Sequence, residues 1–384
     1  MEPYDTIVIG AGPVGSHAAY RLACLGYKVM VLEKKASPGD DICCTGILSK
    51  ECLDTFNIDD NLVLKKYHSA KFFPPSDRYL RLWRESPVAA IIDRPALDKN
   101  LAEKAQRAGA EYIFGSRVTS VTPDTDILKV EIERQKEIFE AKTAIVATGF
   151  GSTLPEKLGL GKIKHYLSGV QAEVDTDIDE AEVYFDQNLA PGGFAWLVPT
   201  EDGKGLAGLL ARHQADVYLR AFLNTLSAQG RIISAEASPN YGAIPLRPLP
   251  RTYSDRVLVV GEAAGQAKPT TGGGIYYGLL CAEIAAGVLH QAFLSGNFSA
   301  KKLSIYQNQW QAKLGRELTI GYWSRRLYSY LSNRFIEHMF HIAARNGIGE
   351  LITTSEDFPF DWHSRFLLQM ASSLLPFPRP AKPL

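Results

Sequence analysis

The sequence predicts an α/β fold in which a parallel β-sheet, assembled from separated segments, carries an inserted antiparallel sheet and precedes a helical C-terminal region. Three observations support this prediction. A short apolar run at residues 7–9 leads into closely spaced glycines, a helical stretch and a second apolar run at 29–32. Strand-like runs separated by Gly, Pro, Asp and Asn follow one another over residues 166–210. The chain beyond residue 299 is mostly of helical type and rich in aromatic residues.

The first glycines form a pattern suited to a dinucleotide. Gly10 permits a tight turn after the strand, Gly12 lets the backbone approach a pyrophosphate, and Gly15 lets the following helix pack closely. The N–H groups and the positive dipole end at the start of that helix favour phosphates. Glu33 lies 18 residues after Gly15, where a carboxylate can accept hydrogen bonds from ribose hydroxyls. We interpret residues 5–33 as a nucleotide cradle.

The same glycine spacing recurs at Gly203, Gly205 and Gly208. These residues follow a polar turn and lead into the run Leu209–Arg212, which is typical of a strand. The surrounding pattern predicts a β-hairpin, so we expect no nucleotide there.

Composition excludes several classes of function. The chain has 384 residues and a formal net charge of zero, without a basic tract, so we expect no nucleic-acid partner. The N-terminal apolar run is too short for a signal peptide. The longest apolar stretch, 275–294, is interrupted by Glu283 and His290, so we expect no transmembrane segment.

Cysteine and histidine usage indicates a reducing compartment and no metal. The five cysteines are odd in number and include the neighbours Cys43 and Cys44, which seldom form an unstrained disulfide. A cytoplasmic location is the simplest expectation. His338 and His341 are one helical turn apart but lack a third candidate ligand, so no metal site is expected.

Other segments complete the expected organisation. Residues 50–92 read as irregular, and a helix is expected from Asp93, with Pro95 in its first turn. Further strands are expected at 112–114, 128–132, 138–147 and 257–260, and a long helix is expected from about Ile275. Prolines at the end of the chain indicate a loose tail: Pro376, Pro378, Pro380 and Pro383.

Four separated motifs resemble a known flavoprotein family, the one that contains p-hydroxybenzoate hydroxylase, and within it the geranylgeranyl reductases. They are the cradle, Cys44–Ile47, the segment Pro191–Pro199 with Phe194 and Trp196, and the segment Gly261–Ile275. The chain departs from the family pattern in four places: Glu262 replaces an Asp, Thr148 replaces the Asp of an Asp-Gly pair, Phe194 replaces a Tyr and Val198 replaces a Phe.

The resemblance implies an FAD-binding, Rossmann-like domain of the p-hydroxybenzoate hydroxylase type. We expect this discontinuous domain at 1–50, 90–160 and 250–298. A substrate-binding antiparallel-sheet domain is expected at 51–89 and 161–249, and a helical C-terminal region at 299–384.

The motifs and the resemblance together predict the residues that contact FAD. The adenine half is expected on the cradle, and the isoalloxazine ring at the loop 270–274, where the start of the next helix can stabilise negative charge on a reduced ring. The expected cofactor contacts are Gly10, Gly12, Pro13, Val14, Gly15, Glu33, Lys34, Cys44, Thr45, Gly46, Arg94, Val118, Ala147, Thr148, Gly149, Gly261, Glu262, Gly272, Gly273, Gly274 and Ile275.

The resemblance also implies the reaction: reduction of isolated C=C bonds in a prenyl (geranylgeranyl-type) lipid by hydride transfer from reduced flavin. Such a reaction needs a proton donor near the ring, and Cys44 is the candidate catalytic residue. Expected substrate contacts are Phe194, Trp196, Pro199 and Tyr276. The expected electron donor is NAD(P)H or a ferredoxin-type protein. A prenyl-lipid substrate further implies transient contact with a membrane surface, at the inner membrane face.

Two other functions remain open at this point: an FAD-dependent aromatic monooxygenase or halogenase of the same fold, and a non-catalytic flavin redox carrier. Single residues also have structural alternatives. Cys44 could be a small buried apolar residue, and Phe194 and Trp196 could be ordinary sheet packing. Residues 272–274 could be only a helix-start loop, and Arg94 could be a plain surface charge.

Overall fold

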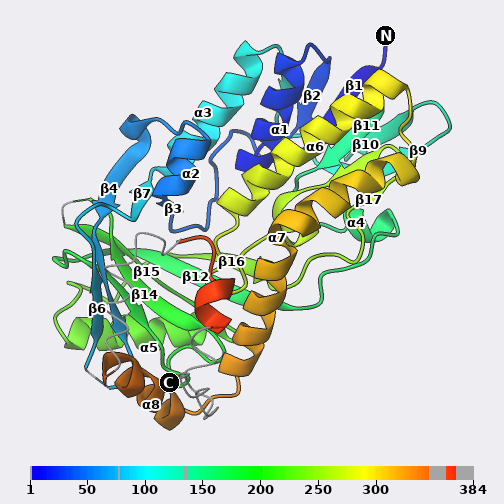
Figure 1. Ribbon diagram of the computed structural model, residues 1–384. Helices are drawn as coiled ribbons and strands as arrows, with labels where there is room; N and C mark the ends of the chain where they lie inside the picture. Colours follow the sequence, from blue (N-terminus) through cyan, green and yellow to red (C-terminus); the bar gives the residue numbers. More distant parts are fainter. Residues whose placement is uncertain (1, 77, 134–136, 202, 346–359, 369–384) are drawn as a thin grey trace, which may run out of the picture.

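The computed structural model describes residues 2–76, 78–133, 137–201, 203–345 and 360–368 (Figure 1). The described strands form three sheets of eight, seven and three strands. The largest sheet has the order β17-β18-β11-β1-β2-β8, with β9 and β10 attached through β11. Its strands are β1 (Tyr4–Ile9), β2 (Val29–Leu32), β8 (Glu111–Ile113), β9 (Val118–Pro123), β10 (Leu128–Ile132), β11 (Ile138–Val146), β17 (Tyr253–Ser254) and β18 (Val257–Val259).

The centre of the large sheet is parallel, as the apolar runs predict. Strand β1 pairs in parallel with β2 and β11, and β11 pairs in parallel with β18. All residues of β2 and β18 are buried, which is typical of strands covered on both faces. The expected strands at 128–132, 138–147 and 257–260 are therefore confirmed, whereas β9 had no sequence prediction.

Helices cover one face of the large sheet. The helices α1 (Pro13–Cys24), α3 (Arg94–Arg107) and α6 (Ile275–Ser295) pack with β1 and β2 in one apolar cluster. Asp93 caps α3, because its side chain accepts a hydrogen bond from the backbone N–H of Ala96 at 2.9 Å. The expected helices from Asp93 and Ile275 are confirmed, and the helical stretch expected after the first glycines is α1. Strand β11 is followed by the short helix α4 (Leu154–Lys157).

Helix α6 is the one described helix that is long and apolar enough to cross a membrane by length and composition. Its most apolar window is 56% buried inside the protein, and its buried side chains belong to the same cluster as α1 and α3. Glu283 and His290 therefore do not make α6 too polar to span a membrane. Its packing against α1 and α3, however, makes it a core helix of the protein.

The second sheet carries the inserted strands and lies in the lower part of Figure 1. Its order is β16-β12-β15-β14-β13-β5-β6. The pairs β12–β15, β14–β15 and β13–β14 are antiparallel, as predicted for residues 166–210. Its strands are β5 (Ser69–Phe73), β6 (Leu80–Trp83), β12 (Tyr166–Asp175), β13 (Ala181–Tyr184), β14 (Phe194–Pro199), β15 (Lys204–Ala211) and β16 (Pro239–Pro245).

We call this seven-stranded sheet the substrate sheet. The hairpin β14–β15 contains Gly203, Gly205 and Gly208, so the prediction that the second glycine match is a hairpin is confirmed. Helix α5 (Ala215–Ala228) covers one face of the sheet through Leu219, Phe222 and other apolar side chains. The opposite face carries Phe194 and Trp196.

The expectation that residues 50–92 are irregular is wrong. This segment holds the helix α2 (Lys50–Thr55), the 3-10 turn η1 (Asp60–Leu62) and the strands β4 (Val63–Tyr67), β5, β6 and β7 (Ala89–Ile92). Strand β3 (Ile47–Ser49), β7 and β4 form the third sheet. The strands of this segment are short, and β4 and β6 are partly exposed, so no strong apolar pattern marks them in the sequence.

The C-terminal region is helical where it is described. Helix α7 (Ala300–Tyr328) packs on α6, and α8 (Asn333–Arg345) follows it. The short segment 360–368 lies against the core, where the Tyr277 hydroxyl donates to the carbonyl oxygen of Asp361 at 2.8 Å. The expected loose tail with Pro376, Pro378, Pro380 and Pro383 lies outside the described residues.

Candidate functional site

Three loops meet at one edge of the large sheet. Residues Gly10–Gly12 follow β1, Ala147–Gly149 follow β11, and Gly261 and Glu262 follow β18, and these three parallel strands are neighbours. Their carboxyl ends therefore lie at the same edge, where doubly wound sheets bind their ligands. The 3-10 turn η2 (Gly261–Ala264) continues the third loop.

Each of the three cradle glycines is glycine for a different structural reason. A Cβ atom on Gly10 would lie 2.5 Å from the carbonyl oxygen of Ala147, and one on Gly15 would lie 1.9 Å from the carbonyl oxygen of Gly10. A Cβ atom on Gly12 would meet nothing within 4 Å. Protein packing therefore requires Gly10 and Gly15, whereas Gly12, at the N-cap of α1, faces open space in which a pyrophosphate can approach.

Glu33 is held beside the cradle. Its Oε2 accepts a hydrogen bond from the backbone N–H of Ala11 at 2.7 Å, and its Oε1 accepts one from Lys35 at 2.9 Å. The backbone N–H of Ser116 donates to the carbonyl oxygen of Glu33 at 2.7 Å, which brings the start of β9 and Val118 to this end of the cradle. Lys34 is exposed next to it.

Pro13 and Val14 begin α1 and help to close the cradle. A Cβ atom on Gly278 of α6 would lie 2.4 Å from Cγ2 of Val14, and a Cβ on Gly261 would lie 3.2 Å from its Cγ1. Val14 thus packs α1 against the third loop, so the position predicted to contact the cofactor also has a packing role.

Arg94 connects the cradle region to the Cys43–Gly46 loop. Its guanidinium forms a buried ion pair with Asp98 at 2.8 Å and lies within hydrogen-bonding reach of the Cys44 thiol. Burial acts to lower the pKa of Arg94, but Cys44 and the Asp98 carboxylate outweigh it and raise that pKa above its usual value. Arg94 is 8% exposed, so it is not a plain surface charge.

Glu262 lies at the start of the loop that leads to α6. A Cβ atom on Gly274 would lie 2.7 Å from its Oε1, so the glycine makes room for this carboxyl group. Desolvation raises the pKa of Glu262 to about 7, while the charge of Arg94 acts in the opposite direction. The longer side chain that replaces the family's Asp is therefore accommodated by Gly274.

The raised pKa of Glu262 predicts a pH dependence of stability. A carboxyl group whose pKa is higher in the folded state favours folding at pH below its unfolded pKa, and this contribution is lost as pH rises through about 7. The variant Glu262→Gln cannot ionise, so we expect its melting temperature relative to wild type to increase between pH 5 and pH 8. Thermal unfolding across this range measures the difference, and a constant or decreasing difference would contradict the assignment.

The Cys43–Thr45 segment lies against the substrate sheet. The Cys43 thiol donates to the carbonyl oxygen of Asn240 on β16 at 3.3 Å, and the Thr45 hydroxyl donates to Oε1 of Gln171 on β12 at 3.1 Å. Burial, with smaller effects from Cys44 and Glu262, raises the pKa of Cys43 to about 11. Gln171 is a site residue that sequence reasoning missed, because a single polar residue in an apolar strand matched no motif.

Trp196 and Phe194 lie on the same sheet face as Gln171. Their rings are 5.8 Å apart, and Gly208 on β15 sits beneath Trp196, since a Cβ atom there would lie 2.5 Å from the indole. Gly208 is also the strand partner of Gln171. The two aromatic residues predicted to contact substrate thus share one surface with the loop that carries Cys44.

The glycine loop before α6 closes over this surface. A Cβ atom on Gly272 would lie 3.2 Å from Ile244 of β16 and 3.4 Å from Leu210 of β15. Leu210 is the strand partner of Phe194. We call residues 270–274 the ring loop. It lies between the cradle edge of the large sheet and the aromatic face of the substrate sheet.

Buried polar contacts from the C-terminal region hold the ring loop. Lys268, directly before it, forms a buried ion pair with Asp361, and the Thr270 hydroxyl bonds to Nδ1 of His363 at 2.7 Å. Arg325 of α7 donates to the carbonyl oxygens of Pro269, at 3.1 Å, and Thr270. Sequence reasoning missed these contacts, because residues distant in the chain supply them.

Two predicted substrate residues lie away from the aromatic face. The Tyr276 hydroxyl donates to Glu51 of α2 at 2.7 Å, and its ring is 6.2 Å from Trp362, so Tyr276 packs against α2 and the 360–368 segment. Pro199 ends β14, and its carbonyl oxygen accepts a hydrogen bond from Tyr67. Phe194 and Trp196 are the predicted substrate residues that the structure brings together.

The residues present fit FAD. Besides the open space at Gly12, the region contains buried polar atoms without a partner among the described residues: Nε of Arg94, Oγ1 of Thr148 and Nε1 of Trp196. Buried polar groups in proteins are normally satisfied, so such atoms indicate a missing polar ligand. Two of the three belong to predicted cofactor contacts.

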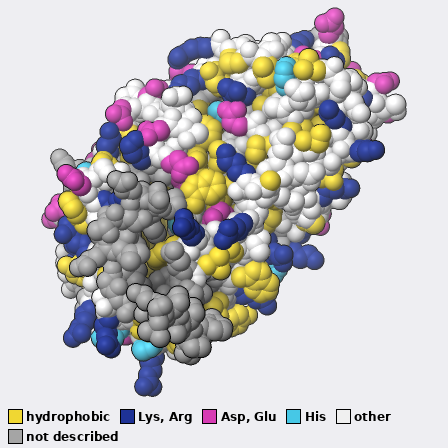
Figure 2. Space-filling view, viewed as in Figure 1, with side chains coloured by type: hydrophobic (Ala, Val, Ile, Leu, Met, Phe, Trp, Pro, Cys, Tyr) yellow, Lys and Arg dark blue, Asp and Glu magenta, His cyan; other side chains and the backbone are white. Residues whose placement is uncertain are grey.

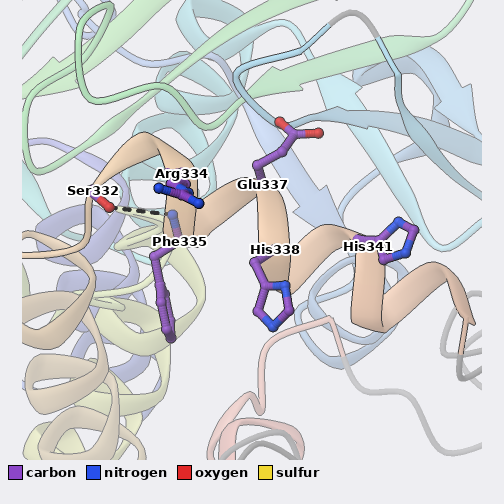
Figure 3. Close-up of a pocket in the computed structure, with 6 residues that line it drawn as sticks. All are labelled: Ser332, Arg334, Phe335, Glu337, His338 and His341. Carbon is purple, nitrogen blue, oxygen red and sulfur yellow. Dashed lines mark hydrogen bonds between the residues drawn. The ribbon is translucent and has the colours of Figure 1, made fainter.

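An open depression of about 540 Å³ lies elsewhere, on α8. Figure 3 shows its lining residues: Ser332, Arg334, Phe335, Glu337, His338 and His341. Among the described residues there is no group of three or more His, Cys, Asp or Glu side chains that could hold a metal ion. The expectation that the chain binds no metal stays a prediction.

Comparisons with known proteins find a matching family model and similar proteins. The family model described as pyridine nucleotide-disulphide oxidoreductase matches residues 4–187, which include the cradle. A protein of Methanothermobacter thermautotrophicus named digeranylgeranylglycerophospholipid reductase 2 is 32% identical over 332 residues, which cover 82% of this chain and 85% of that protein.

Solved structures share the fold. A geranylgeranyl bacteriochlorophyll reductase-like protein of Thermoplasma acidophilum superposes with a TM-score of 0.84 at 24% identity, covering 96% of this chain and 100% of that one. The halogenase PltM, in complex with FAD, superposes with a TM-score of 0.71 at 14% identity, covering 98% and 93%.

Proposed function

This chain belongs to the digeranylgeranylglycerophospholipid reductase family, and on that premise we propose that it is an FAD-dependent oxidoreductase that saturates isolated C=C bonds of a prenyl lipid. One observation carries the proposal: the aromatic face with Phe194 and Trp196 lies directly beside the ring loop. An apolar wall at that place suits a prenyl chain better than a charged metabolite.

The chain's own residues would hold FAD from one end to the other. The open N-terminus of α1 at Gly12 would accept the pyrophosphate, and Glu33 would bond the adenine ribose. Glu262 and Arg94 would bond polar groups between the two ends of the cofactor. When bound, FAD supplies the hydride chemistry. The ring loop, which Lys268 and Arg325 help to hold in place, would exclude water from the reacting centre.

Cys44 is our proposed proton donor. Alkene reduction needs a proton at the second carbon, and a thiol is a stronger acid than a hydroxyl. The Arg94 guanidinium, within hydrogen-bonding reach of the thiol, would stabilise the negative charge that remains on sulfur after proton transfer. Asp98 in turn holds Arg94 in place at 2.8 Å.

We expect Cys44→Ser to retain FAD and to reduce a prenyl substrate on the order of 100-fold more slowly, since a general acid contributes about 10²–10⁴-fold. The rate of flavin reoxidation in a single turnover measures this effect. Cys43→Ser is the matched control, because its thiol donates to the Asn240 carbonyl, a bond that a hydroxyl can also make. An unchanged rate in Cys44→Ser, or an equal loss in both variants, would assign Cys44 a structural role only.

Partners and location follow from the substrate class. We infer that the protein acts at the surface of the membrane that contains its lipid, from the cytoplasmic side. Electrons would come from NAD(P)H bound transiently or from a ferredoxin-type protein. Among the residues that the structure describes, the second glycine match lies in a hairpin, so it offers no cradle for a nicotinamide cofactor.

Lipid mass spectrometry after co-expression with a prenyl-lipid pathway tests the proposed function. We expect lipid masses to rise by pairs of hydrogen atoms relative to cells without the protein. Hydroxylated or halogenated products would support the monooxygenase or halogenase alternative, which rests on shared fold alone. Unchanged lipids together with reversible flavin reduction would favour the redox carrier.

A further inference from the structure

Exposed aromatic and basic side chains gather where α7 ends and α8 begins. Trp323 is 56% exposed, Leu327 65%, Tyr330 70% and Phe335 45%. Figure 2 shows hydrophobic and basic side chains side by side over the lower part of α7. We call this surface the elbow, defined by Trp323, Arg326, Leu327, Tyr330, Arg334 and Phe335.

Residues of the elbow contact one another and a neighbouring arginine. Trp323 and Leu327 are four residues apart on α7, so they lie on one helix face. The Arg326 guanidinium lies 5.4 Å from the centre of the Trp323 ring. The Arg212 guanidinium lies 5.2 Å from the centre of the Tyr330 ring, which extends the surface onto the end of β15.

The charge of the elbow is positive and locally unbalanced. Arg212, Arg326 and Arg334 form no ion pair with a carboxylate of any described residue. The carboxylate of Glu337 on α8 lines the same depression as Arg334 and is hydrogen-bonded by the backbone and hydroxyl of Ser76 at 3.1 and 2.7 Å, so it offsets one of the three positive charges without forming an ion pair. Unpaired arginines beside exposed Trp and Tyr are typical of surfaces at the membrane–water interface.

The inner side of the elbow contacts the aromatic face of the substrate sheet. Arg325 lies 5.2 Å from the centre of the Phe194 ring, and Tyr328 lies 6.1 Å from Phe185. Phe185 is 6.1 Å from Phe194 and 5.8 Å from Phe340 of α8. An aromatic path therefore runs from Trp196 through Phe194 to the helices that carry the elbow.

We propose that the elbow is the surface by which this protein docks on a bilayer containing anionic phospholipids, with Trp323 and Tyr330 at the headgroup level. The inference deepens the proposed function and rests on it, since it needs a substrate that resides in a membrane. Docking there sets the end of the aromatic path beside the bilayer that contains the substrate. Anionic headgroups supply the negative partners that Arg212, Arg326 and Arg334 do not have in ion pairs within the described protein.

Vesicle flotation of the FAD-bound full-length protein tests the docking surface. We expect binding to vesicles of phosphatidylglycerol and phosphatidylcholine, with weaker binding to phosphatidylcholine alone. Substituting Trp323→Ala and Tyr330→Ala together should weaken partitioning on the order of tenfold, because both rings lose apolar contact with the bilayer. Arg326→Gln should weaken it about fivefold, and only on anionic vesicles.

Trp83→Ala is the matched control, because Trp83 is 48% exposed on β6 of the substrate sheet and should not affect partitioning. Equal losses in the elbow and control variants, or unchanged binding in the elbow variants, would overturn the proposal. The proposal would also be overturned if wild-type protein were a dimer in light scattering and the elbow variants were monomers that still bound vesicles. The elbow would then be the contact between two copies of the chain.

Assays in two media separate this inference from the proposed function. Elbow variants should reduce a detergent-solubilised prenyl lipid at the wild-type rate but a vesicle-embedded one more slowly. Equal rates in both media would overturn the docking surface and leave the reductase intact. If wild-type protein binds vesicles through the elbow but reduces no prenyl lipid, the docking surface would stand and the proposed reductase activity would be overturned.

Discussion

Substituting Gly12 with valine is expected to weaken FAD binding so much that the purified protein loses its flavin and, without added FAD, its turnover. The side chain would enter the open space in which the pyrophosphate is expected to approach the N-terminus of α1. Overpacking of about 3 kcal/mol corresponds to roughly 100-fold weaker binding. Because no protein atom lies within 4 Å of the added Cβ, the protein itself should still fold. The visible absorbance and released flavin of the purified variant measure the loss.

Gly287→Val is the matched control for Gly12. It is an exposed glycine of α6, and a Cβ atom there also meets nothing within 4 Å. We expect it to retain FAD with no loss of helix stability, because valine is no worse a helix former than glycine. Gly205, although it belongs to the second glycine match, is unsuitable, because a Cβ there would lie 2.7 Å from Thr176 and disturb the hairpin. A yellow Gly12→Val protein with a normal flavin content would refute the cradle assignment.

Replacing Asp361 with alanine is expected to destabilise the protein by about 3–5 kcal/mol, the usual cost of removing one partner of a buried ion pair. Lys268 and Asp361 are 5% and 2% exposed, so the variant leaves a buried ammonium group without its carboxylate. Since Lys268 directly precedes the ring loop, the flavin fluorescence should change as well. Urea unfolding of the FAD-bound protein measures the loss of stability.

Asp54→Ala provides the comparison for Asp361. Asp54 pairs with Lys50 on the surface of α2, where the two side chains are 62% and 65% exposed. Exposed pairs of this kind contribute about 0–1 kcal/mol, so little change is expected. Equal losses in the two variants would show that the 360–368 segment does not hold the ring loop through this ion pair.

The cradle could be predicted from the sequence because close backbone contacts require its glycines, and these glycines lie near one another in the chain. Gly10 and Gly15 are required by contacts with Ala147 and with each other, and Glu33 ends the neighbouring strand. The hairpin at Gly205 could be distinguished from the cradle by its local sequence too, since its glycines follow a polar turn and lead into a strand instead of a helix.

Other parts of the site left no local pattern. The contact between Lys268 and Asp361 joins residues 93 positions apart, and the sequence around either residue gives no sign of its partner. Gln171 becomes a site residue only because β12 lies beside β15 under the Cys43–Thr45 segment. The strands of residues 50–92 were missed because they are short and partly exposed, so tertiary pairing rather than apolar periodicity determines them.

The most direct test of the proposed reductase is the reaction of the reduced protein with a prenyl lipid without oxygen. The FAD-bound protein is first reduced chemically under anaerobic conditions, and a geranylgeranyl lipid in detergent is then added. We predict that the flavin absorbance returns at a rate that depends on lipid concentration. We also predict one saturated double bond for each flavin reoxidised, measured by mass spectrometry. A flavin that stays reduced until oxygen is admitted, with the lipid mass unchanged, would contradict the assignment.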